Sequence, residues 1–513
     1  MSVMHQVIPR EYRDSVALMQ LSAALAKLPG IVQASAVMGT ENNLGLLRQA
    51  GMDIGDVAVG PSDLLIVVQG DESALKPALE EATARLARQG GDAGGEVKAV
   101  APHSIAMALS VAPSARIAMI STPGEYATAE ALKALNMGLN VMLFSNNVSV
   151  PDEAMLKRVA RDRGLIVMGP DCGTAIINGI PLAFANVVKR GPIGAVGASG
   201  TGLQEVTVLV DRLGSGISQA IGTGGHDLSH EVGGISMLTG LQALTDDPDT
   251  KVIVLISKPP APDIAERILD SARKAGKPVV IIFLGEAAAG RSTGNIIFAD
   301  TLEDAARTAV ALAEGRTPPA PSGAPPLPTG IPKLAAGQKY LRGLFSGGTF
   351  CFQATMLLQQ TMAIHSNSSV GESLPLADLF HSEGNTVVDL GEDVFTRGRP
   401  HPMIDYRLRT ERLLQEASDP AMAVLLIDVV LGYGSNLDPA SELVPALREA
   451  WKIAEGAGRS FICVGHVCGT TGDPQGLAGQ EKALREAGMI LADSNAQAVR
   501  LAQAIAARAG EAA

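Results

Sequence analysis

The sequence predicts an α/β protein with several open parallel sheets and a small α/β module at the amino terminus. Short, continuously apolar segments alternate with longer amphipathic ones, which is typical of strands buried on both faces of a sheet. Gly-rich turns follow many of these apolar segments. Gly and Ala are abundant whereas aromatic residues make up 3%, as in proteins with close helix–sheet packing. At 513 residues, the chain is long enough for several domains.

Two stretches rich in Pro or Gly divide the chain. The clearer one is 317–332, where seven prolines separated by small residues predict a semi-extended linker. The weaker one is a Gly cluster at 90–95 that follows a strongly helical segment. The predicted parts are a small module (1–95), two α/β domains (96–190 and 191–316), the linker (317–334) and a third α/β domain (335–513).

The first part is predicted to be a small α/β or ferredoxin-like module. Its expected elements are a helix at 15–28, a strand at 32–38, a helix at 42–49, a strand at 64–68 and a helix at 73–87.

A regular alternation of strands and helices begins near Arg116 and then restarts twice. Its first section has strands at 117–120, 139–144 and 165–168, with helices at 127–135 and 152–163. The second has strands at 193–198, 217–221, 252–256 and 278–284, and the third has strands at 344–345, 386–389, 421–428, 461–464 and 490–491. Open sheets of this kind bind ligands at the carboxyl ends of their strands, where the Gly-rich turns fall here.

Charge and composition exclude several classes of function. A formal net charge of −12 and the lack of basic stretches interleaved with aromatics argue against nucleic-acid or membrane-surface binding. No secretory signal or apolar run long enough for a membrane helix is evident. Four cysteines are too few for a disulfide framework. We therefore expect a cytoplasmic protein.

The best candidate for an anion site is the turn Ser199-Gly200-Thr201, which joins an apolar strand to a helix. Backbone N–H groups and the helix dipole favour a phosphate, a phosphoryl group or a carboxylate at such a turn. An ordinary strand–helix turn capped by Ser or Thr has the same sequence pattern.

Similar turns follow two other strands. The loop after the strand at 217–221 contributes Gly222, Gly224, Gly225, His226 and Asp227, and His226 is a candidate acid, base or ligand. The loop after the strand at 421–428 contributes Gly432 and Gly434. A solvated histidine, and glycines that only supply positive φ angles, are the structural alternatives.

Three further motifs contain reactive side chains. Asp171 and Cys172 end a strand, but no activating histidine lies close in sequence, which favours a packed thiol. The loop that contains Arg399, His401 and Asp405 holds its histidine between two prolines, as a site residue or as part of a structural turn. The run from Cys463 to Cys468 does not match a common zinc pattern, so no metal is predicted.

Several of these runs resemble the succinyl-CoA-synthetase superfamily, with α-type and β-type modules in one chain. Residues 115–172 are similar to the end of an α subunit's Rossmann-like CoA-binding domain. Residues 193–283 are similar to its flavodoxin-like domain, and 343–507 to the carboxyl-terminal, also flavodoxin-like, domain of a β subunit. The whole chain is similar to the FdrA family, through the runs 142–153, 169–179, 258–262 and 339–349.

The resemblance implies a subunit of an oxamate-carbamoyltransferase-like assembly that passes a carbamoyl or acyl group to or from phosphate. It pairs the turn at Ser199 with the turn at Gly432 across a shared cleft, and implies additional subunits, an oligomer, a small carboxylate or carbamoyl substrate, phosphate or an acyl or carbamoyl phosphate, and a place for CoA. Two departures limit it. The stretch 285–297 has no histidine where synthetases carry a phosphohistidine, and no ATP-grasp domain fits before Gly343. A ligase with its phosphoryl acceptor moved to His226 and a non-catalytic CoA- or nucleotide-binding scaffold are the alternatives.

Overall fold

The computed structural model describes residues 2–11, 13, 15–55, 57–89, 102–286, 292–396 and 399–512. They form two compact units. The first contains 1–113 and 391–405, and the second contains 114–390 and 406–513. The predicted boundary at 95 and the centre of the stretch 285–297 lie outside the described residues.

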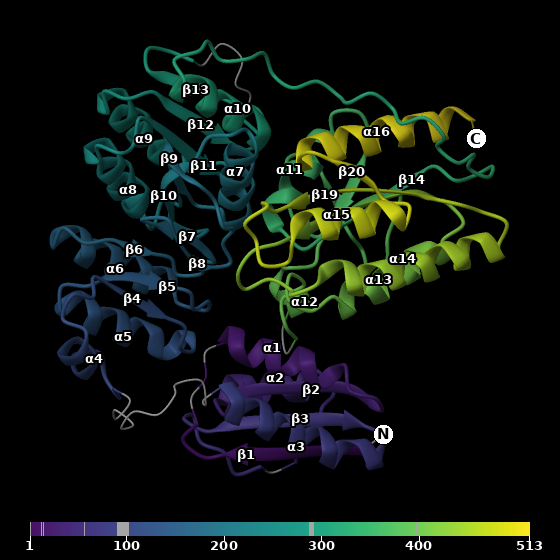
Figure 1. The fold of residues 1–513 in the computed structure, drawn as a ribbon, viewed down its shortest axis with the longest axis horizontal. Helices are drawn as coiled ribbons and strands as arrows, with labels where there is room; N and C mark the ends of the chain where they lie inside the picture. Colours follow the sequence, from purple (N-terminus) through teal and green to yellow (C-terminus); the bar gives the residue numbers. More distant parts are fainter. Residues whose placement is uncertain are drawn as a thin grey trace. The chain divides into compact units, whose positions relative to one another are not determined.

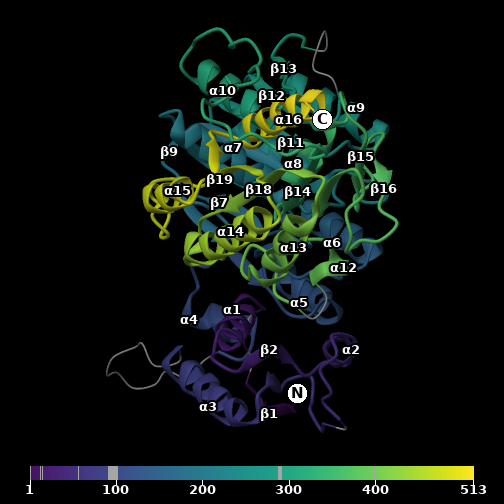
Figure 2. The ribbon, with the colours of Figure 1, turned by 90° about the vertical axis from the view of Figure 1, so that its right-hand side faces the viewer.

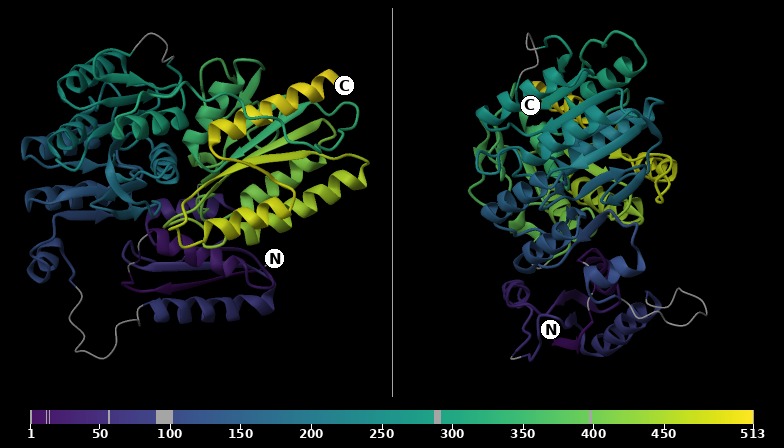
Figure 3. Two further views of the ribbon diagram at one scale, coloured as in Figure 1. Left: turned by 45° about the horizontal axis from the view of Figure 1, so that its top comes forward. Right: turned by 90° about the vertical axis from the view of Figure 1, so that its left-hand side faces the viewer.

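The amino-terminal unit is a three-stranded antiparallel sheet with helices on both faces. Leu64, Ile66 and Val68 of its central strand pack against the first and third helices, while Leu65 and Val67 pack against the second. Figure 3 shows this sheet with a long helix beside it. The elements of the unit are β1 (Ser2–Ile8), α1 (Ser15–Ala26), β2 (Ile31–Met38), α2 (Glu41–Gln49), β3 (Leu64–Gly70), α3 (Glu72–Gln89), α4 (Ile105–Val111) and α12 (Asp393–Thr396), with strand order β1-β3-β2. Strand β1 is absent from the prediction because it is a half-exposed edge strand with a mixed pattern of polar and apolar residues.

The second unit begins with a small parallel sheet of strand order β4-β5-β6. Ser149 caps helix α6 by accepting a hydrogen bond from the Asp152 N–H, and proline follows in the first turn, where its missing N–H costs nothing. The elements are β4 (Ile117–Ile120), α5 (Gly124–Asn136), β5 (Asn140–Leu143), α6 (Val150–Asp162) and β6 (Val167–Met168).

A seven-stranded sheet follows, with strand order β13-β12-β11-β9-β10-β7-β8 (Figure 1). Strands β9 to β13 are parallel, β7 pairs antiparallel with β10, and β8 pairs antiparallel with β7. The hairpin lies within the range 96–190, so the domain boundary predicted at 190 divides residues that share one sheet. The elements are β7 (Thr174–Ile177), β8 (Ile180–Ala183), β9 (Arg190–Gly197), α7 (Gly200–Arg212), β10 (Ile217–Gly222), α8 (Ile235–Asp246), β11 (Val252–Ser257), α9 (Pro262–Lys274), β12 (Val279–Phe283), β13 (Ile296–Phe298) and α10 (Leu302–Ala313).

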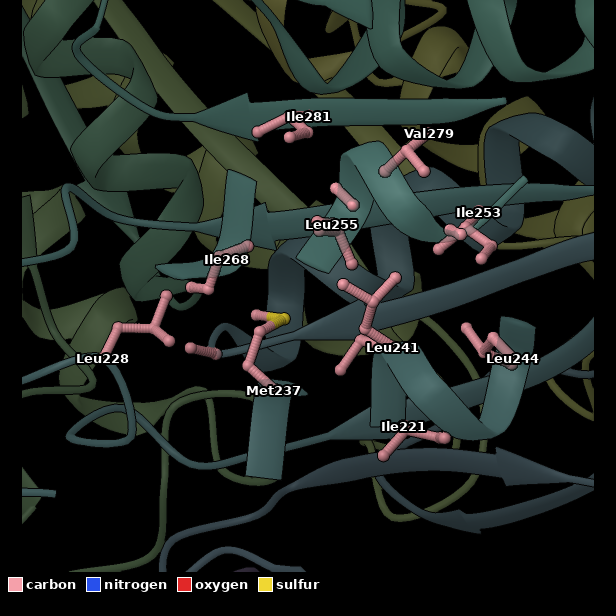
Figure 4. Packing of buried hydrophobic residues seen from close by; sticks show 14 of the residues in the cluster. Ile221, Leu228, Met237, Leu241, Leu244, Ile253, Leu255, Ile268, Val279 and Ile281 are labelled. Carbon is pink, nitrogen blue, oxygen red and sulfur yellow. The ribbon is translucent and has the colours of Figure 1, made fainter. Parts of the chain in front are cut away.

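The core of this sheet is aliphatic. Helices α8 and α9 cover one face, where Met237, Leu241 and Ile268 interlock with Leu255 and Ile281 of the strands (Figure 4). Helices α7 and α10 pack against each other and against the strands on the opposite face (Figure 1). A sheet covered on both faces explains why its central strands are apolar at almost every position.

The third sheet is parallel throughout, with strand order β16-β15-β17-β14-β18-β19-β20. Helices α13 and α14 lie side by side on one face (Figure 2), and α11 packs against α16 on the other. The elements are β14 (Tyr340–Phe345), α11 (Gly348–Leu358), β15 (Ile364–Ser366), β16 (Leu374–Pro375), β17 (Asn385–Asp389), α13 (Arg407–Ser418), β18 (Met422–Val430), α14 (Pro439–Gly456), β19 (Ile462–Cys468), α15 (Leu477–Glu486), β20 (Ile490–Ala492) and α16 (Asn495–Ala512).

These elements confirm the predicted α/β class with several mostly parallel sheets and a small amino-terminal α/β module. Every predicted strand of the second unit is present. The strands that the prediction omits are short ones at or next to sheet edges: the hairpin β7–β8, β13, β15 and β16. Among the helices that the structure describes, we find none with the length and apolar character required to cross a bilayer.

Candidate functional site

The turn at Ser199 opens helix α7 directly after strand β9. Ser199 is extended, and its Oγ accepts a hydrogen bond from the Gly202 N–H at 3.1 Å, so it is the helix N-cap. A Cβ on Gly202 would lie 2.4 Å from that Oγ atom, which explains the glycine at this position. The first helical residue, Gly200, is exposed.

A second turn of the same kind opens helix α11 directly after strand β14. The Asp428 carboxylate, buried at the end of β18, accepts hydrogen bonds from the Ser346 N–H (2.8 Å) and the Gly347 N–H (2.9 Å). The buried Arg409 guanidinium donates to the same carboxylate at 2.9 Å. Asp428 thereby holds the turn through its buried residues Ser346 and Gly347, whereas Gly348, the first residue of α11, is half-exposed.

The two helix beginnings meet. The Ser199 Oγ lies 2.5 Å from the Thr349 Oγ1, and the Thr349 N–H donates to the Thr201 Oγ1 at 3.3 Å. We call the residues 199–201 and 347–349 the helix-end site. It places the positive ends of two helix dipoles, from two different sheets, next to each other, and such ends bind anions.

The contacts pair the Ser199 turn with the turn at 346–349, in place of the turn at Gly432 that the resemblance pairs with it. A Cβ on Gly432 would lie 2.6 Å from the Ala185 carbonyl oxygen, and one on Gly434 would lie 2.9 Å from the Phe184 ring. Both glycines therefore permit close packing on the segment after β8. The sequence prediction used 346–349 only as part of a family motif. Gly347 and Gly348 nevertheless follow shortly after a predicted strand, which is the pattern that indicated the other candidate turns.

A buried carboxylate–imidazole pair lies next to the helices that form the helix-end site. Glu205 of α7 lies 3.5 Å from the His466 Nε2 of β19, and both side chains are almost fully buried. Burial alone would raise the pKa of Glu205, but the His466 imidazole, and secondly the Asn495 N–H, hold it below its ordinary value. The His466 ring also packs edge-on against Phe350 of α11. His466 thus links both helices to the third sheet, a role distinct from the metal ligand considered for it.

A second polar cluster lies where helix α6 meets the loop after β10. The fully buried Lys157 ammonium donates to Glu153 Oε1 (2.6 Å), Asp227 Oδ1 (2.8 Å) and the Thr223 carbonyl oxygen (2.8 Å). The His226 side chain is 67% exposed, and its Nδ1 lies 3.6 Å from Glu153 Oε2. We call these five residues the histidine pocket.

Two atoms of the histidine pocket are buried without a hydrogen-bond partner among the described residues: Glu153 Oε2 and Thr223 Oγ1. Burial raises the pKa of Glu153 above its ordinary value, although the Lys157 charge opposes this shift. Asp227 has a structural role as well, since its carboxylate accepts the Ser236 N–H (3.1 Å) and Met237 N–H (2.8 Å) of α8. Asp227 is thus buried in this network and is not exposed to a cleft.

The histidine pocket and the helix-end site lie at the same edge of the seven-stranded sheet. The Thr223 N–H donates to the Gly197 carbonyl oxygen at 2.8 Å, which ties the two loops together. Thr174 touches both loops, because a Cβ on Gly200 would lie 3.4 Å from its Oγ1 and one on Gly222 would lie 2.3 Å from its carbonyl oxygen. Gly225 directly precedes His226, and a Cβ on Gly225 would have no neighbour within 4 Å.

Cys172 is packed beneath the same loop. Its Sγ lies 3.5 Å from the Gly222 carbonyl oxygen, and burial raises the pKa of the thiol to about 12. This agrees with the inert thiol that the sequence favours, since a nucleophile would need a lowered pKa. The neighbouring Asp171 is exposed, with a φ of 52°, and its N–H donates to the Ser145 carbonyl oxygen.

The loop with Arg399, His401 and Asp405 belongs to the amino-terminal unit. The Met403 N–H donates to the His401 Nδ1 at 3.2 Å, so this histidine takes part in a turn. His401 is half-buried, whereas Arg399 is exposed.

Three family models match the chain. A model described as "CoA-ligase" matches 344–505, one described as "CoA binding domain" matches 188–285, and one described as "AllF, heavy metal-associated domain" matches 1–102. The helix-end site therefore joins a turn from the second matched region to a turn from the first.

Full-length similarity decides the family. The chain is 41% identical to YahF of Escherichia coli K12, an uncharacterized protein, over 98% of each chain. The chain belongs to the FdrA family. It is also 26% identical to subunit alpha 2 of an ADP-forming succinate–CoA ligase from Archaeoglobus fulgidus, over 32% of this chain and 58% of that subunit. The dinucleotide-forming acetyl-coenzyme A synthetase 1 of Ca. Korarchaeum cryptofilum matches with 16% identity over 77% of this chain and 84% of its own, at a TM-score of 0.32. Family membership places the protein among acyl-CoA-synthetase-like proteins of the succinate–CoA ligase superfamily.

The description "heavy metal-associated" does not fit the donor atoms of the amino-terminal module. Heavy metals favour thiolate ligands, but residues 1–102 contain no cysteine and one histidine, His5. Across the described part of the chain, no three His, Cys, Asp or Glu side chains are grouped so that they could hold an ion. We therefore derive no chemistry from a metal here.

Proposed function

We propose that the protein is the subunit of an oxamate-carbamoyltransferase-like enzyme that moves a carbamoyl or acyl group to or from phosphate, and that phosphate binds at the helix-end site. The observation that carries this proposal is the contact between Ser199 and Thr349, which sets two Gly-rich helix beginnings against each other. The positive ends of two helices that are held in place favour both a bound dianion and the charge that develops during acyl transfer.

The surroundings of the site support a bound anion over a purely structural contact. Gly200 is exposed, and a Cβ on it would meet only the Thr174 Oγ1 at 3.4 Å, so an anion can approach the backbone there. Gly348 is half-exposed but lies beside the Asp389 carboxylate, since a Cβ on it would be 2.6 Å from Oδ2. Lys258 follows the neighbouring strand β11, and its ammonium lies 5.4 Å from the centre of the Phe352 ring on α11. It adds positive charge at the edge of the sheet where α7 and α11 begin.

A phosphate-binding turn also suits the phosphates of CoA, for which the matched "CoA binding domain" is named. Inorganic phosphate, carbamoyl phosphate, CoA and ATP are therefore tested in parallel, by the rise in melting temperature of the full chain. We expect phosphate and carbamoyl phosphate to raise it. A rise with CoA or ATP alone would favour a nucleotide-binding scaffold.

A variant locates the binding site. Gly200→Asp adds a carboxylate at the first helical position, where an acidic side chain stabilises the helix but repels a second anion. We expect it to weaken phosphate binding at least tenfold. Ser104→Asp, which adds the same charge at the exposed start of α4, is the matched control. Equal phosphate affinity in all three proteins would refute the site.

The ligase with a phosphoryl acceptor at His226 remains a second candidate, because Glu153 faces that imidazole. It predicts a base-stable phosphoryl label after incubation with labelled ATP or acyl phosphate, and loss of the label in His226→Gln. The carbamoyltransferase predicts no such label.

A further inference from the structure

The histidine pocket holds an exposed imidazole next to a buried carboxylate. An ammonium group has three N–H donors, and Lys157 directs all three to protein oxygens. Glu153 is therefore fixed through its Oε1, while its Oε2 remains without a hydrogen bond 3.6 Å from the His226 Nδ1. An unpartnered buried carboxylate oxygen is costly, so its position calls for a functional explanation.

A carboxylate at Nδ1 gives an imidazole a defined chemical use. It orients the ring through Nδ1 and leaves Nε2 to exchange a proton with a substrate. Two other histidines lack this combination. His230 faces Asp263 at 3.0 Å, but both side chains are exposed, and His466 is itself buried.

In the part of the chain that the structure describes, the cluster contains a second unpartnered polar atom, which belongs to the fully buried Thr223. The Thr223 Oγ1 is buried and has no hydrogen-bond partner among the described residues, although its backbone N–H and carbonyl are both engaged.

We propose that His226 is the proton donor to the leaving nitrogen when an amide-type donor passes its carbamoyl group to phosphate. This inference rests on the proposed function. An oxygen of hydrogen phosphate forms a bond to the carbamoyl carbon, and the C–N bond breaks with its electron pair on nitrogen. The His226 Nε2 gives that nitrogen a proton, and the proton that phosphate loses restores the imidazolium. Glu153 and Lys157 are positioning residues.

The test compares two reactions of the complex isolated through a tag on the full chain. The first forms carbamoyl phosphate from an N-carbamoyl amide, carbamoyl-oxamate, and has a basic leaving nitrogen. The second forms carbamoyl phosphate from phosphate and 4-nitrophenyl carbamate, whose phenolate leaves without needing a proton. We expect His226→Gln to slow the first about 10²- to 10⁴-fold, the usual contribution of a general acid, and the second less than threefold. His230→Gln is the matched control and should change neither rate.

The outcomes separate this inference from the proposed function. If the wild-type complex neither binds phosphate nor performs either reaction, the proposed function fails and this inference fails with it. If Gly200→Asp abolishes both reactions but His226→Gln leaves the first intact, the helix-end site stands and the proton donor is refuted. Equal losses of both rates in His226→Gln also refute it, since a general acid acts according to leaving-group basicity. Glu153→Gln should slow only the first reaction, which a purely structural role would not do.

Discussion

Replacing Lys157 by methionine tests whether the histidine pocket depends on its buried charge. Methionine keeps much of the length of the side chain but removes the ammonium that holds Glu153 and Asp227, which are both almost fully buried. Breaking a buried ion pair by removing one partner costs about 3–5 kcal/mol, because the remaining charge loses its compensation. Three short contacts to one ammonium place this site within that range.

Local stability is measured by native-state hydrogen exchange of the α6 amides, since a protein of several sheets need not unfold in one step. A loss of about 3–5 kcal/mol corresponds to exchange about 10²- to 10⁴-fold faster. The matched control is Lys133→Met on α5. Lys133 contacts Glu130 at the same 2.6 Å, but both are solvent-accessible, and exposed pairs contribute less than about 1 kcal/mol. Equal, small changes in the two variants would refute the reasoning.

The pH dependence of α6 provides a second check. The pKa of Glu153 is raised in the folded protein, so the folded state binds more protons than the unfolded chain. Its contribution to stability is therefore complete below the ordinary pKa of a glutamate and is lost as the pH rises through the raised value. We expect a steeper loss in Lys157→Met, because the lysine charge opposes the shift.

Three further outcomes follow from packing and burial. Gly224→Ala should destabilise the loop after β10, because a Cβ would lie 2.3 Å from the Pro170 carbonyl oxygen at a φ of +85°, and a lower melting temperature would show it. Asn186→Ala should cost about 1–3 kcal/mol in denaturant titrations, because it removes a 2.8 Å hydrogen bond to the buried Asp473. Cys172 should not react with iodoacetamide at pH 8 until the protein is denatured, because its thiol is buried and its pKa is raised to about 12; mass spectrometry shows an early adduct if this is wrong.

The sequence was sufficient for the parallel sheets because their strands carry the signal locally. Strand β18 spans nine residues, all apolar except Asp428, and is buried at every position, so its pattern alone identifies it. The hairpin β7–β8 also had a local signal. Asn178 and Gly179 adopt positive φ angles of 52° and 79° between two short apolar runs, and Asn-Gly is the strongest short hairpin signal. Its strands were missed because they are only four residues long.

The candidate site was less accessible to sequence reasoning because it depends on long-range contacts. Lys157 and Glu153 read as an ordinary surface pair at helical spacing, and nothing local shows that Asp227, 70 residues later, closes over them. Likewise, the Ser199 turn has the pattern of an anion site, but its neighbour Thr349 lies 150 residues away. Local pattern thus identifies turns, whereas the pairing of turns requires the tertiary structure.

The helix-end site has a consequence for how the polypeptide could be divided. The two sheets that contribute to it are held together by side chains as well as by the chain itself: Arg212 donates to the carbonyl oxygens of Gly469 and Val467, and the Val187 N–H donates to Asp473. The proline-rich segment at 317–332 lies outside the helices and strands and is largely exposed. A single protease cut there should yield two fragments that stay associated, with the two halves of the helix-end site still in contact. The covalent link then acts chiefly as a tether that sets the effective concentration of one half for the other.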